Sequence, residues 1–390
     1  MKNKLLTIFF GEWVRIFSTP RLLIVLFGVP LFIFAYYASL MNQGVPTKLP
    51  VAILDQDKTP LSRQLGLMFQ ASATIDLAYY VNDELEGEKL VKKNDAYAFI
   101  IIPRHFQKNI LKGNYTTVSC SYNGQYLLSG AIILKDFQTV AQTFLAGVVL
   151  ETLEQKGLSE RQALGSILPI NTDIHVLYNP YTSYSYYLNI AFMPMALQIM
   201  VMIMSVYTFG LVLKQKKGQE LLAQAGGNVY VAILGKILPY TIIFFTLGFL
   251  MNCLLYYKIG TPLKASFIGV NVIFFVFVVV CQCLALFIAS ITTSFRTALT
   301  IGGDYAALAF SFAGYTFPAL AMNKFVQYLC FIFPYTSYMR FIVDYATRGI
   351  TFNAAQKGYI IAFAIFAVFG VIGIPLYHKK LKKGHYDSIA

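Results

Sequence analysis

Few residues in this chain have the types and spacing that catalysis requires. His105 and His175 lie about seventy residues apart in the one long polar stretch, and no HExxH, GxSxG or paired-cysteine motif occurs. Asp55 and Asp57 could suggest an acid pair, but Asp-x-Asp before Thr-Pro at the end of a strand is more typical of turn and helix-cap chemistry. The chain also lacks GxxxxGK[ST], the loop that cradles nucleotide phosphates, so ATP-driven work would need a separate subunit.

The amino-acid composition indicates whether the chain folds in water or in a lipid bilayer. Of 390 residues, 57% are hydrophobic and only 13% are charged, which excludes an ordinary soluble enzyme. The net charge is +13, but residues 42–184 hold twelve basic and thirteen acidic side chains. The positive excess therefore lies between apolar runs, as in the cytoplasmic loops of membrane proteins, and does not imply nucleic acid.

Six stretches are apolar and long enough to cross a bilayer, which takes about 20 residues per helix. Asp304 is the only formal charge inside them, and lysines and arginines beside the first, second and last stretches predict that both termini are cytoplasmic. The apolar residues 325–339 are interpreted as a re-entrant helix within an outer segment, 319–350, since a seventh span would place the terminal lysines outside. The six predicted spans are residues 22–41, 187–213, 237–257, 267–292, 297–318 and 358–377.

Residues 1–20 show one apolar face and are predicted to form a helix lying in the cytoplasmic interface, ended by Pro20. The first span, within 21–41, is read as an uncleaved signal anchor. A cleaved signal peptide is the rival interpretation, but the polar lead is long and the apolar run exceeds the usual length. Residues 379–390 form a basic cytoplasmic tail.

The normally charged residues 42–184 are long enough for a domain of their own and should lie outside the cytoplasm. Strand-like and helical runs alternate through this stretch, which predicts an α/β module followed by a long helix over 127–156. The predicted fold class is therefore a polytopic α-helical membrane protein of six transmembrane helices. Helices 2–6 fall in 185–378, and the extracytoplasmic α/β domain is inserted between helices 1 and 2.

Two further groups of residues are singled out within the predicted membrane region. Phe317-Pro318 and Phe333-Pro334 bracket the re-entrant stretch, and helices broken by proline at membrane depth persist where they line a cavity or the protein interior. We predict an outer gate there, with an amphipathic hairpin in the outer headgroup layer as the alternative. The second group consists of polar side chains inside spans, which are expected to join helices, except that Asp304 could be functional or structural: Asn189, Gln198, Asn252, Gln282 and Asp304.

Several short motifs, taken in their order along the chain, resemble those of the permeases of type-2 ATP-binding-cassette (ABC) exporters. The resemblance is in particular to the bacterial branch with a large extracytoplasmic domain after the first span. The resemblance covers nearly the whole chain. Its motifs are Val51 to Arg63 (VAILDQDKTPLSR), Tyr184-Ser-Tyr186, Leu234-Gly-Lys236-Ile-Leu-Pro239, Gly314 to Pro318, and Phe333 to Thr336.

The resemblance implies a permease subunit of an exporter in the bacterial cytoplasmic membrane, moving an amphipathic, lipid-like or drug-like substrate outward. Two permease chains and two cytoplasmic ABC ATPase subunits would form the complex, in contact with membrane lipid. This chain would bind no cofactor itself, because ATP and Mg²⁺ would be held by the ATPase. Some exporters of this branch work with an envelope adaptor protein, which the extracytoplasmic domain would contact.

The cytoplasmic loop 214–230 is predicted to couple this chain to the ATPase, together with the helix face that bears Glu12. The predicted coupling residues of the loop are Lys216, Lys217, Gly218, Gln219 and Glu220. The family's loop commonly has an acidic-basic-acidic cluster before Gly-Thr, which this loop lacks, so homodimer and heterodimer both stay open. The alternative function is a membrane-anchored receptor or scaffold whose extracytoplasmic domain binds a ligand or an envelope partner.

Overall fold

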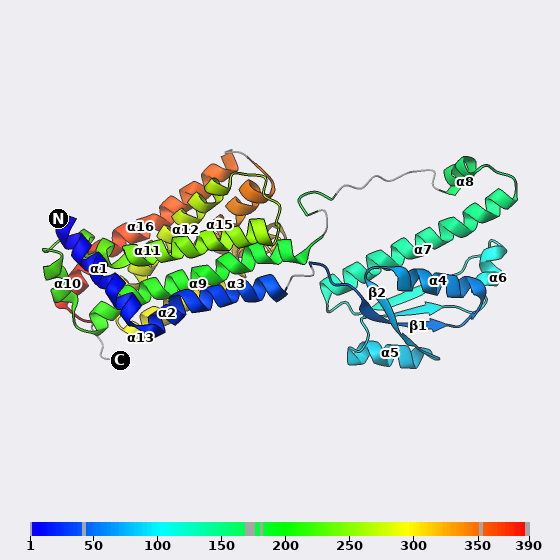
Figure 1. Ribbon diagram of the computed structural model, residues 1–390, viewed down its shortest axis with the longest axis horizontal. Helices are drawn as coiled ribbons and strands as arrows, with labels where there is room; N and C mark the ends of the chain where they lie inside the picture. Colours follow the sequence, from blue (N-terminus) through cyan, green and yellow to red (C-terminus); the bar gives the residue numbers. More distant parts are fainter. Residues whose placement is uncertain (1, 41–43, 168–175, 180–181, 351–353, 387–390) are drawn as a thin grey trace. The chain divides into compact units, whose positions relative to one another are not determined.

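The computed structural model describes the chain except residues 1, 41–43, 168–175, 180–181, 351–353 and 387–390, and it gives no side-chain description for residues 2, 164–167, 354 and 355. The chain divides into two compact units, one of Met1–Gly44 with Val176–Ala390 and one of Val45–His175. We call them the helical unit and the inserted unit (Figure 1). His175, one of the two histidines considered above, lies outside the described residues.

The helical unit contains α-helices joined by short turns. Three of the helices run on into five-residue π-helical turns, so those helices are longer than their α-helical part. Its elements are α1 (Lys2–Ser18), α2 (Pro20–Leu23), a π-turn (Ile24–Gly28), α3 (Val29–Leu40), α9 (Tyr184–Lys214), α10 (Gly218–Gln224), α11 (Val229–Cys253), a π-turn (Leu254–Lys258), α12 (Phe267–Ile291), α13 (Phe295–Leu308), a 3₁₀ turn (Ala319–Ala321), α14 (Lys324–Cys330), α15 (Pro334–Ile342), a π-turn (Val343–Thr347) and α16 (Ala354–Lys383).

Among the described residues, six helices are long and apolar enough to cross a membrane. Five of them coincide with predicted spans: Pro20–Leu40, Tyr184–Lys214, Val229–Lys258, Phe267–Ile291 and Gln356–Lys383. The chain is therefore a mostly helical, polytopic membrane protein. The sixth such helix is Leu127–Gln155, which belongs to the inserted unit and coincides with the long helix predicted over 127–156.

The predicted fifth span, 297–318, is wrong as a single helix. The helix there, α13, has only 14 residues, or about 21 Å, which is less than the roughly 30 Å of a bilayer's hydrocarbon core. After α13 the chain turns through Gly314, whose φ of +70° favours glycine, and Pro318, which cannot continue a helix. Mean apolarity over 297–318 is high enough for a span, but α13 ends at Leu308, and Gly314 and Pro318 keep the chain after it from continuing as a helix.

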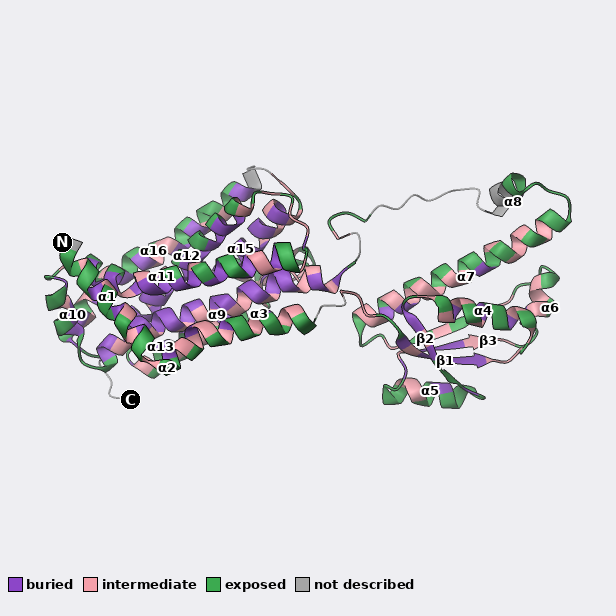
Figure 2. Ribbon diagram, in the orientation of Figure 1, coloured by how far each residue is buried: buried purple, intermediate pink, exposed green. Residues whose placement is uncertain are grey.

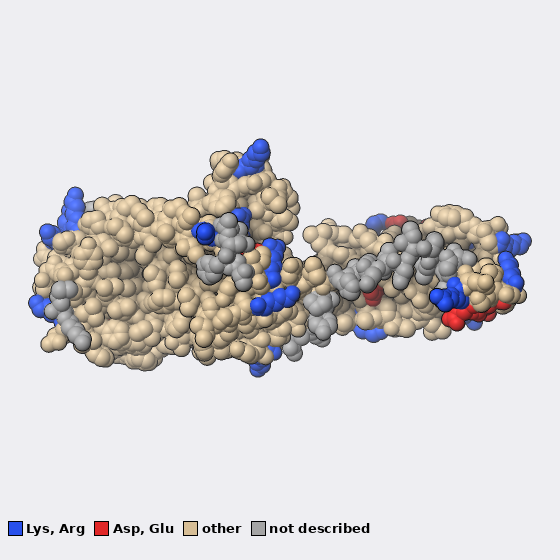
Figure 3. Space-filling model, turned by 90° about the horizontal axis from the view of Figure 1, so that it is seen from above, with Lys and Arg blue, Asp and Glu red and all other residues tan. Residues whose placement is uncertain are grey.

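The core of the helical unit forms around α9, which contacts α3, α11, α12 and α13. Figure 2 shows α9 mostly buried, whereas the outward faces of α3 and α16 are exposed. Many of these exposed side chains are large and apolar, including Phe32 at 70% and Val371 at 65% exposed. On the face that Figure 3 shows, the charged side chains of this unit gather at its two ends, and an uncharged surface separates them. Such a surface suits lipid.

The inserted unit contains a four-stranded sheet in the order β2-β1-β3-β4, in which β1 pairs parallel with β2 and β3, and β4 pairs antiparallel with β3. This confirms the predicted alternation of strands and helices. Its elements are β1 (Leu49–Asp55), α4 (Pro60–Ala71), β2 (Ile75–Tyr80), α5 (Glu84–Lys93), β3 (Ala98–Ile102), α6 (Phe106–Leu111), β4 (Ser119–Tyr122), α7 (Leu127–Gln155) and α8 (Glu160–Ile167).

Helices cover both faces of this sheet. On one face α4 and α7 pack on alternate strand residues such as Val51 and Ile100, and on the other face α5 packs near Ala52 and Phe99. A ring stack between Phe69 of α4 and Phe137 of α7, with centroids 5.5 Å apart, joins the two helices.

Asp55 and Asp57 perform the turn and cap chemistry expected of them. Asp55 Oδ1 accepts hydrogen bonds from the amides of Asp57 and Lys58 at 3.0 and 2.9 Å. Asp57 Oδ2 accepts from the Thr59 hydroxyl at 2.7 Å and the Gln107 amide at 3.0 Å. Partial burial acts to raise the pKa of Asp57, but these and neighbouring hydrogen bonds to the ionised carboxylate outweigh it, so the pKa lies below its usual value.

Candidate functional site

The helical unit presents functional features at both ends. We call residues 2–18, 215–228 and 377–386 the termini end, since both termini and α10 lie there (Figure 1). We call residues 178–179, 182–187, 258–266 and 309–350 the junction end. The predicted coupling residues lie at the termini end, and the predicted gate residues lie at the junction end.

A buried charge cluster joins α1 to α11 at the termini end. Glu12 of α1 is only 2% exposed. Its Oε2 lies 2.5 Å from Lys236 Nζ, and its Oε1 lies 2.9 Å from Arg15 Nη1 and accepts a hydrogen bond from the Tyr240 hydroxyl at 3.0 Å. A carboxylate is stable in such a place only when cations and hydrogen-bond donors surround it.

Glu12 lies on the face of α1 that packs against α11, and its part in coupling to an ATPase stays a prediction. α1 lies close against α11 because Gly235 has no side chain there, and a Cβ on Gly235 would lie 2.8 Å from Ile8. The close approach brings Glu12 to Lys236, so the carboxylate points into the helical unit. The sequence held one signal of this pairing, because Lys236 is a single lysine at the start of an otherwise apolar run.

A polar cavity of about 250 Å³ lies beside the cluster. Among the predicted coupling residues, Lys217 and Glu220 line it together with Glu12. Arg15 also contributes to the wall, and its Nη2 is buried without a hydrogen-bond partner among the described residues. Residues of α1, α10, α11 and the end of α9 therefore line one cavity that contains several charged side chains.

On another side, α10 is attached to the end of α16. The Gly218 amide donates to the Gly384 carbonyl at 3.3 Å, and Gln219 Nε2 donates to the Lys382 carbonyl at 2.9 Å. A Cβ on Gly218 would lie 3.0 Å from Gly384 Cα, so only glycine allows this contact without movement of the backbone. Lys216, another predicted coupling residue, is exposed.

Two of the polar residues inside spans join α11 to α12. Asn252 Nδ2 donates to Asn271 Oδ1 at 3.1 Å, and the Thr241 hydroxyl donates to Gln282 Oε1 at 2.8 Å. Interhelical hydrogen bonds of this kind contribute on the order of 1 kcal/mol each. These contacts agree with the interpretation of Asn252 and Gln282 as residues that join helices.

The polar residues of α9 differ from this pattern. Asn189 Nδ2 donates to the Ser185 hydroxyl of its own helix at 3.1 Å. Gln198 is 1% exposed, and neither of its amide atoms has a hydrogen-bond partner among the described residues. A buried water would satisfy such an amide.

Asp304 lies on the exposed face of α13, and no residue of the described chain pairs with its carboxylate. Thr300 and Thr297 are exposed on the same face, one and two helical turns earlier. An ionised side chain within a membrane unit is costly when it faces lipid. Asp304 therefore makes this face of α13 less suited to lipid than the apolar outer faces of α3 and α16, although Ile301 and Leu308 are also exposed on α13.

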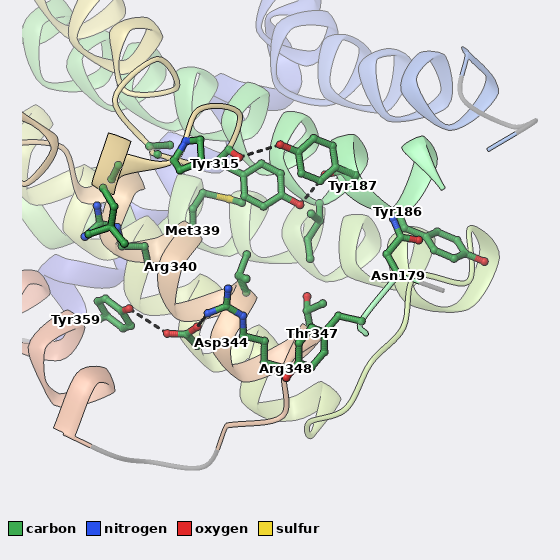
Figure 4. Close-up of a pocket in the computed structure, with 18 of the residues that line it drawn as sticks. Asn179, Tyr186, Tyr187, Tyr315, Met339, Arg340, Asp344, Thr347, Arg348 and Tyr359 are labelled. Carbon is green, nitrogen blue, oxygen red and sulfur yellow. Dashed lines mark hydrogen bonds and ion pairs between the residues drawn. The ribbon is translucent and has the colours of Figure 1, made fainter. Parts of the chain in front are cut away.

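At the junction end, a cavity of about 750 Å³ opens between the start of α9, the irregular segment after α13, and α14–α15 (Figure 4). Tyr187 and Tyr315 close one side of it: each hydroxyl donates to the other residue's carbonyl at 2.8 Å, and the rings stack 4.7 Å apart. This reciprocal pair holds the non-helical segment around Gly314 against α9.

An ion pair stands in the same wall. Asp344 is 8% exposed, its Oδ1 lies 2.8 Å from Arg348 Nη1, and its Oδ2 accepts a hydrogen bond from the Tyr359 hydroxyl at 3.0 Å. Arg340 lies in the same wall, with its guanidinium 5.1 Å from the centre of the Phe331 ring. The spacing of Asp344 and Arg348, one helical turn apart, is the signal that could have identified the pair from sequence.

The four predicted gate residues do not form one constriction. Pro318 lines the cavity, but Phe317 is 55% exposed. Phe333 is 4% exposed and packs against Phe312 and Tyr305, with ring centroids 5.2 and 5.1 Å away. Pro334 is buried as the first residue of α15. The aromatic contact beside the cavity is instead Tyr187–Tyr315.

The comparison with protein families decides what kind of membrane protein this is. Residues 20–374 match the family described as ABC-2 family transporter protein, which covers most of the chain. The chain belongs to the ABC-2 family of transporter proteins. Among curated proteins, none matches it.

Membership of the ABC-2 family makes the chain a permease component of a transporter and implies association with an ABC ATPase. The described residues of this ABC-2 protein contain no group of three or more His, Cys, Asp or Glu side chains arranged to hold a metal ion. The cluster at Glu12 brings three charged side chains together in the helical unit, and its contribution to stability can be measured directly.

We expect Glu12→Gln to lower the free energy of unfolding by about 3 kcal/mol, because it leaves Lys236 and Arg15 partly buried without a countercharge. Adding Lys236→Met should recover part of the loss. Unfolding of the purified protein in mixed micelles, titrated with SDS, measures both. The control is Glu88→Gln, which breaks an exposed pair with Lys92 and should change stability by less than about 1 kcal/mol. Equal effects of Glu12→Gln and Glu88→Gln would contradict the structural role given to the cluster.

Proposed function

We propose that this chain is the permease subunit of an ATP-driven ABC exporter in a bacterial cytoplasmic membrane. It moves an amphipathic, lipid-like or drug-like substrate out of the cytoplasm or the inner leaflet, while a separate subunit holds ATP and Mg²⁺ and hydrolyses the nucleotide. Family membership supports the transport role. The observation that carries the ATP-driven part is the position of α10.

A helix can pass a partner's movement into the membrane only if it is held on both sides. α10 is bonded to α16 through Gly218 and Gln219 and contributes Lys217 and Glu220 to the polar cavity beside α1. Lys216 and Gln224 are exposed, and Gln224 Nε2 donates a hydrogen bond to Glu220 Oε1 at 3.3 Å within α10, so these side chains are accessible to a second protein. We infer that the ATPase contacts α10 and the polar cavity, and that movement of α10 is passed to α16.

Charge supports a cytoplasmic location for the termini end. Lysines and arginines are concentrated there, in the N-terminal helix, the loop before α10 and the last turns of α16. By the rule that such residues remain inside, both termini are cytoplasmic and the inserted unit is outside.

The face of α13 that bears Asp304 supports a second permease chain. A position facing lipid does not suit Thr297, Thr300 and Asp304. A position beside a water-filled path between two chains does suit these polar side chains. We therefore propose that two copies, or this chain and a related one, face each other through α13 and that substrate passes between them. The outer gate of this path is then formed at the junction-end cavity, with the Tyr187–Tyr315 pair and Pro318 in its wall and Phe333 as an anchor of α15.

The orientation can be tested by thiol labelling in a variant whose five native cysteines are replaced by alanine. Cysteines at Lys92 and Lys258 should react with an impermeant maleimide added to intact cells, and cysteines at Gln219 and Lys382 should react only after the membrane is opened. Cys120 should contribute little to the background, because burial raises the pKa of that thiol to about 12 and suppresses the reactive thiolate. Labelling of Lys382→Cys in intact cells would contradict the proposed topology.

The second chain can be tested by cross-linking in native membranes. Cysteines placed singly at positions 297, 300 and 304 should give a cross-linked dimer with a short thiol-reactive linker at one position or more. Matched controls are Ile365→Cys and Val368→Cys on α16, which are 58% and 51% exposed and should face lipid. Dimers at the α16 positions and none on α13 would overturn the proposed arrangement.

A further inference from the structure

The inserted unit has a cavity of its own that transport through the helical unit does not use. It measures about 690 Å³ and lies between α6, the loop 111–118 and the second half of α7. All its lining residues belong to the inserted unit. Its volume falls within the roughly 300–1,000 Å³ typical of small-molecule sites.

The cavity exists because α7 extends beyond the part that packs on the sheet. Ile133 and Phe144 are buried, at 0% and 5% exposed, and the Phe144 ring stacks on Phe106 with centroids 5.9 Å apart. From residue 145 to 155 the helix has no buried residue, although five of these positions are Leu or Val. Apolar side chains that the fold leaves uncovered are typical of a surface that binds an apolar partner.

The walls of the cavity are apolar, and its charged residues are all basic. Leu65, Val118, Phe137 and Val148 are among the apolar side chains. Two lysines, Lys112 and Lys156, are included, both exposed, and no carboxylate of the described residues lines the cavity. An apolar site with only basic charges suits an apolar chain that ends in an anion.

The cavity is open to solvent at a mouth where apolar residues are exposed. Leu111 is 63%, Tyr115 is 90% and Leu145 is 52% exposed, and all three line it. Covering these side chains would gain on the order of 25 cal/mol per Å² of apolar surface removed from water. A bound apolar chain would supply that cover.

We propose that the inserted unit binds a single-chain anionic amphiphile, with its apolar chain in the cavity between α6 and α7 and its anionic headgroup beside Lys112 and Lys156. A fatty acid and a singly acylated phosphate share this chemistry. The proposal does not depend on ATP-driven transport, because binding needs only the inserted unit's own residues.

The test uses the full-length protein in nanodiscs of phosphatidylcholine and a palmitic acid analogue that carries a photoreactive diazirine on its chain. After irradiation, digestion and mass spectrometry, labelled peptides should come from residues 106–118 and 141–156. Unlabelled palmitate should compete, as should dodecyl phosphate if the site accepts any anionic headgroup. Hexadecyltrimethylammonium, which has the same kind of chain and a cationic head, should compete at least threefold less well.

Variants separate this site from general adsorption. Ala141→Trp places a large ring in the cavity and should lower labelling at least threefold, whereas Gln142→Trp, on the exposed side of the same helix, should not. The charge reversal Lys112→Glu with Lys156→Glu changes only exposed residues, so the fold should persist, and it should weaken palmitate competition. Lys108→Glu with Lys135→Glu makes the same charge change away from the cavity and should have no effect.

Three results would overturn the proposal. Labels confined to the helical unit would show that the analogue only partitions into lipid. Labelling of 141–156 that palmitate does not reduce, or that Ala141→Trp leaves unchanged, would show non-specific adsorption. Cross-links between two copies through α7 would instead assign this surface to contact between chains.

Discussion

A carboxylate buried among two cations and a phenol, at Glu12, fixes the arrangement of the helical unit. Charge removed from water must be compensated locally, so α1 can lie only where Lys236 and Tyr240 of α11 meet it. The same position directs the chain through Pro20 into the first membrane helix and places α1 beside the polar cavity that α10 shares. Since α10 is bonded to α16, one charge requirement ties the first, third and last membrane helices together at the termini end.

The junction end follows a different constraint, which is that backbone groups inside a bilayer need partners. α13 stops after 14 residues, and the described chain after it has only short helices, α14 and α15 among them, before α16. Contacts such as the reciprocal Tyr187–Tyr315 hydrogen bonds hold that segment in protein rather than lipid. The irregular backbone leaves a cavity where a straight helix would have left none.

Local patterns of apolar and polar residues in the sequence were enough to predict much of this structure. Continuous apolar runs gave five of the membrane helices, and alternating strand and helix runs gave the sheet of the inserted unit. Hydropathy failed at 297–318 because it averages over the turns that follow Leu308, where α13 ends, and over Gly314 and Pro318, which keep the helix from resuming. The burial of Glu12 was missed because its partner Lys236 lies 224 residues away, and a helical face cannot show such a pairing. The gate aromatics were chosen for their prolines, whereas burial separates Phe333 from the exposed Phe317.

The central claim is that α10 and α16 move together and carry a cytoplasmic signal to the junction end. Spin labels on one chain measure this by pulsed electron resonance: Ala223 and Lys379 carry the labels at the termini end, and Leu320 of the junction end and Tyr257, directly before its segment 258–266, carry the others. The samples are the complex purified with its native ATPase, before and after trapping with ATP and vanadate. The account predicts that the 223–379 distance changes by less than about 2 Å while the 257–320 distance changes by more, as rigid-body transmission requires. A large change between 223 and 379 with an unchanged 257–320 distance would contradict it.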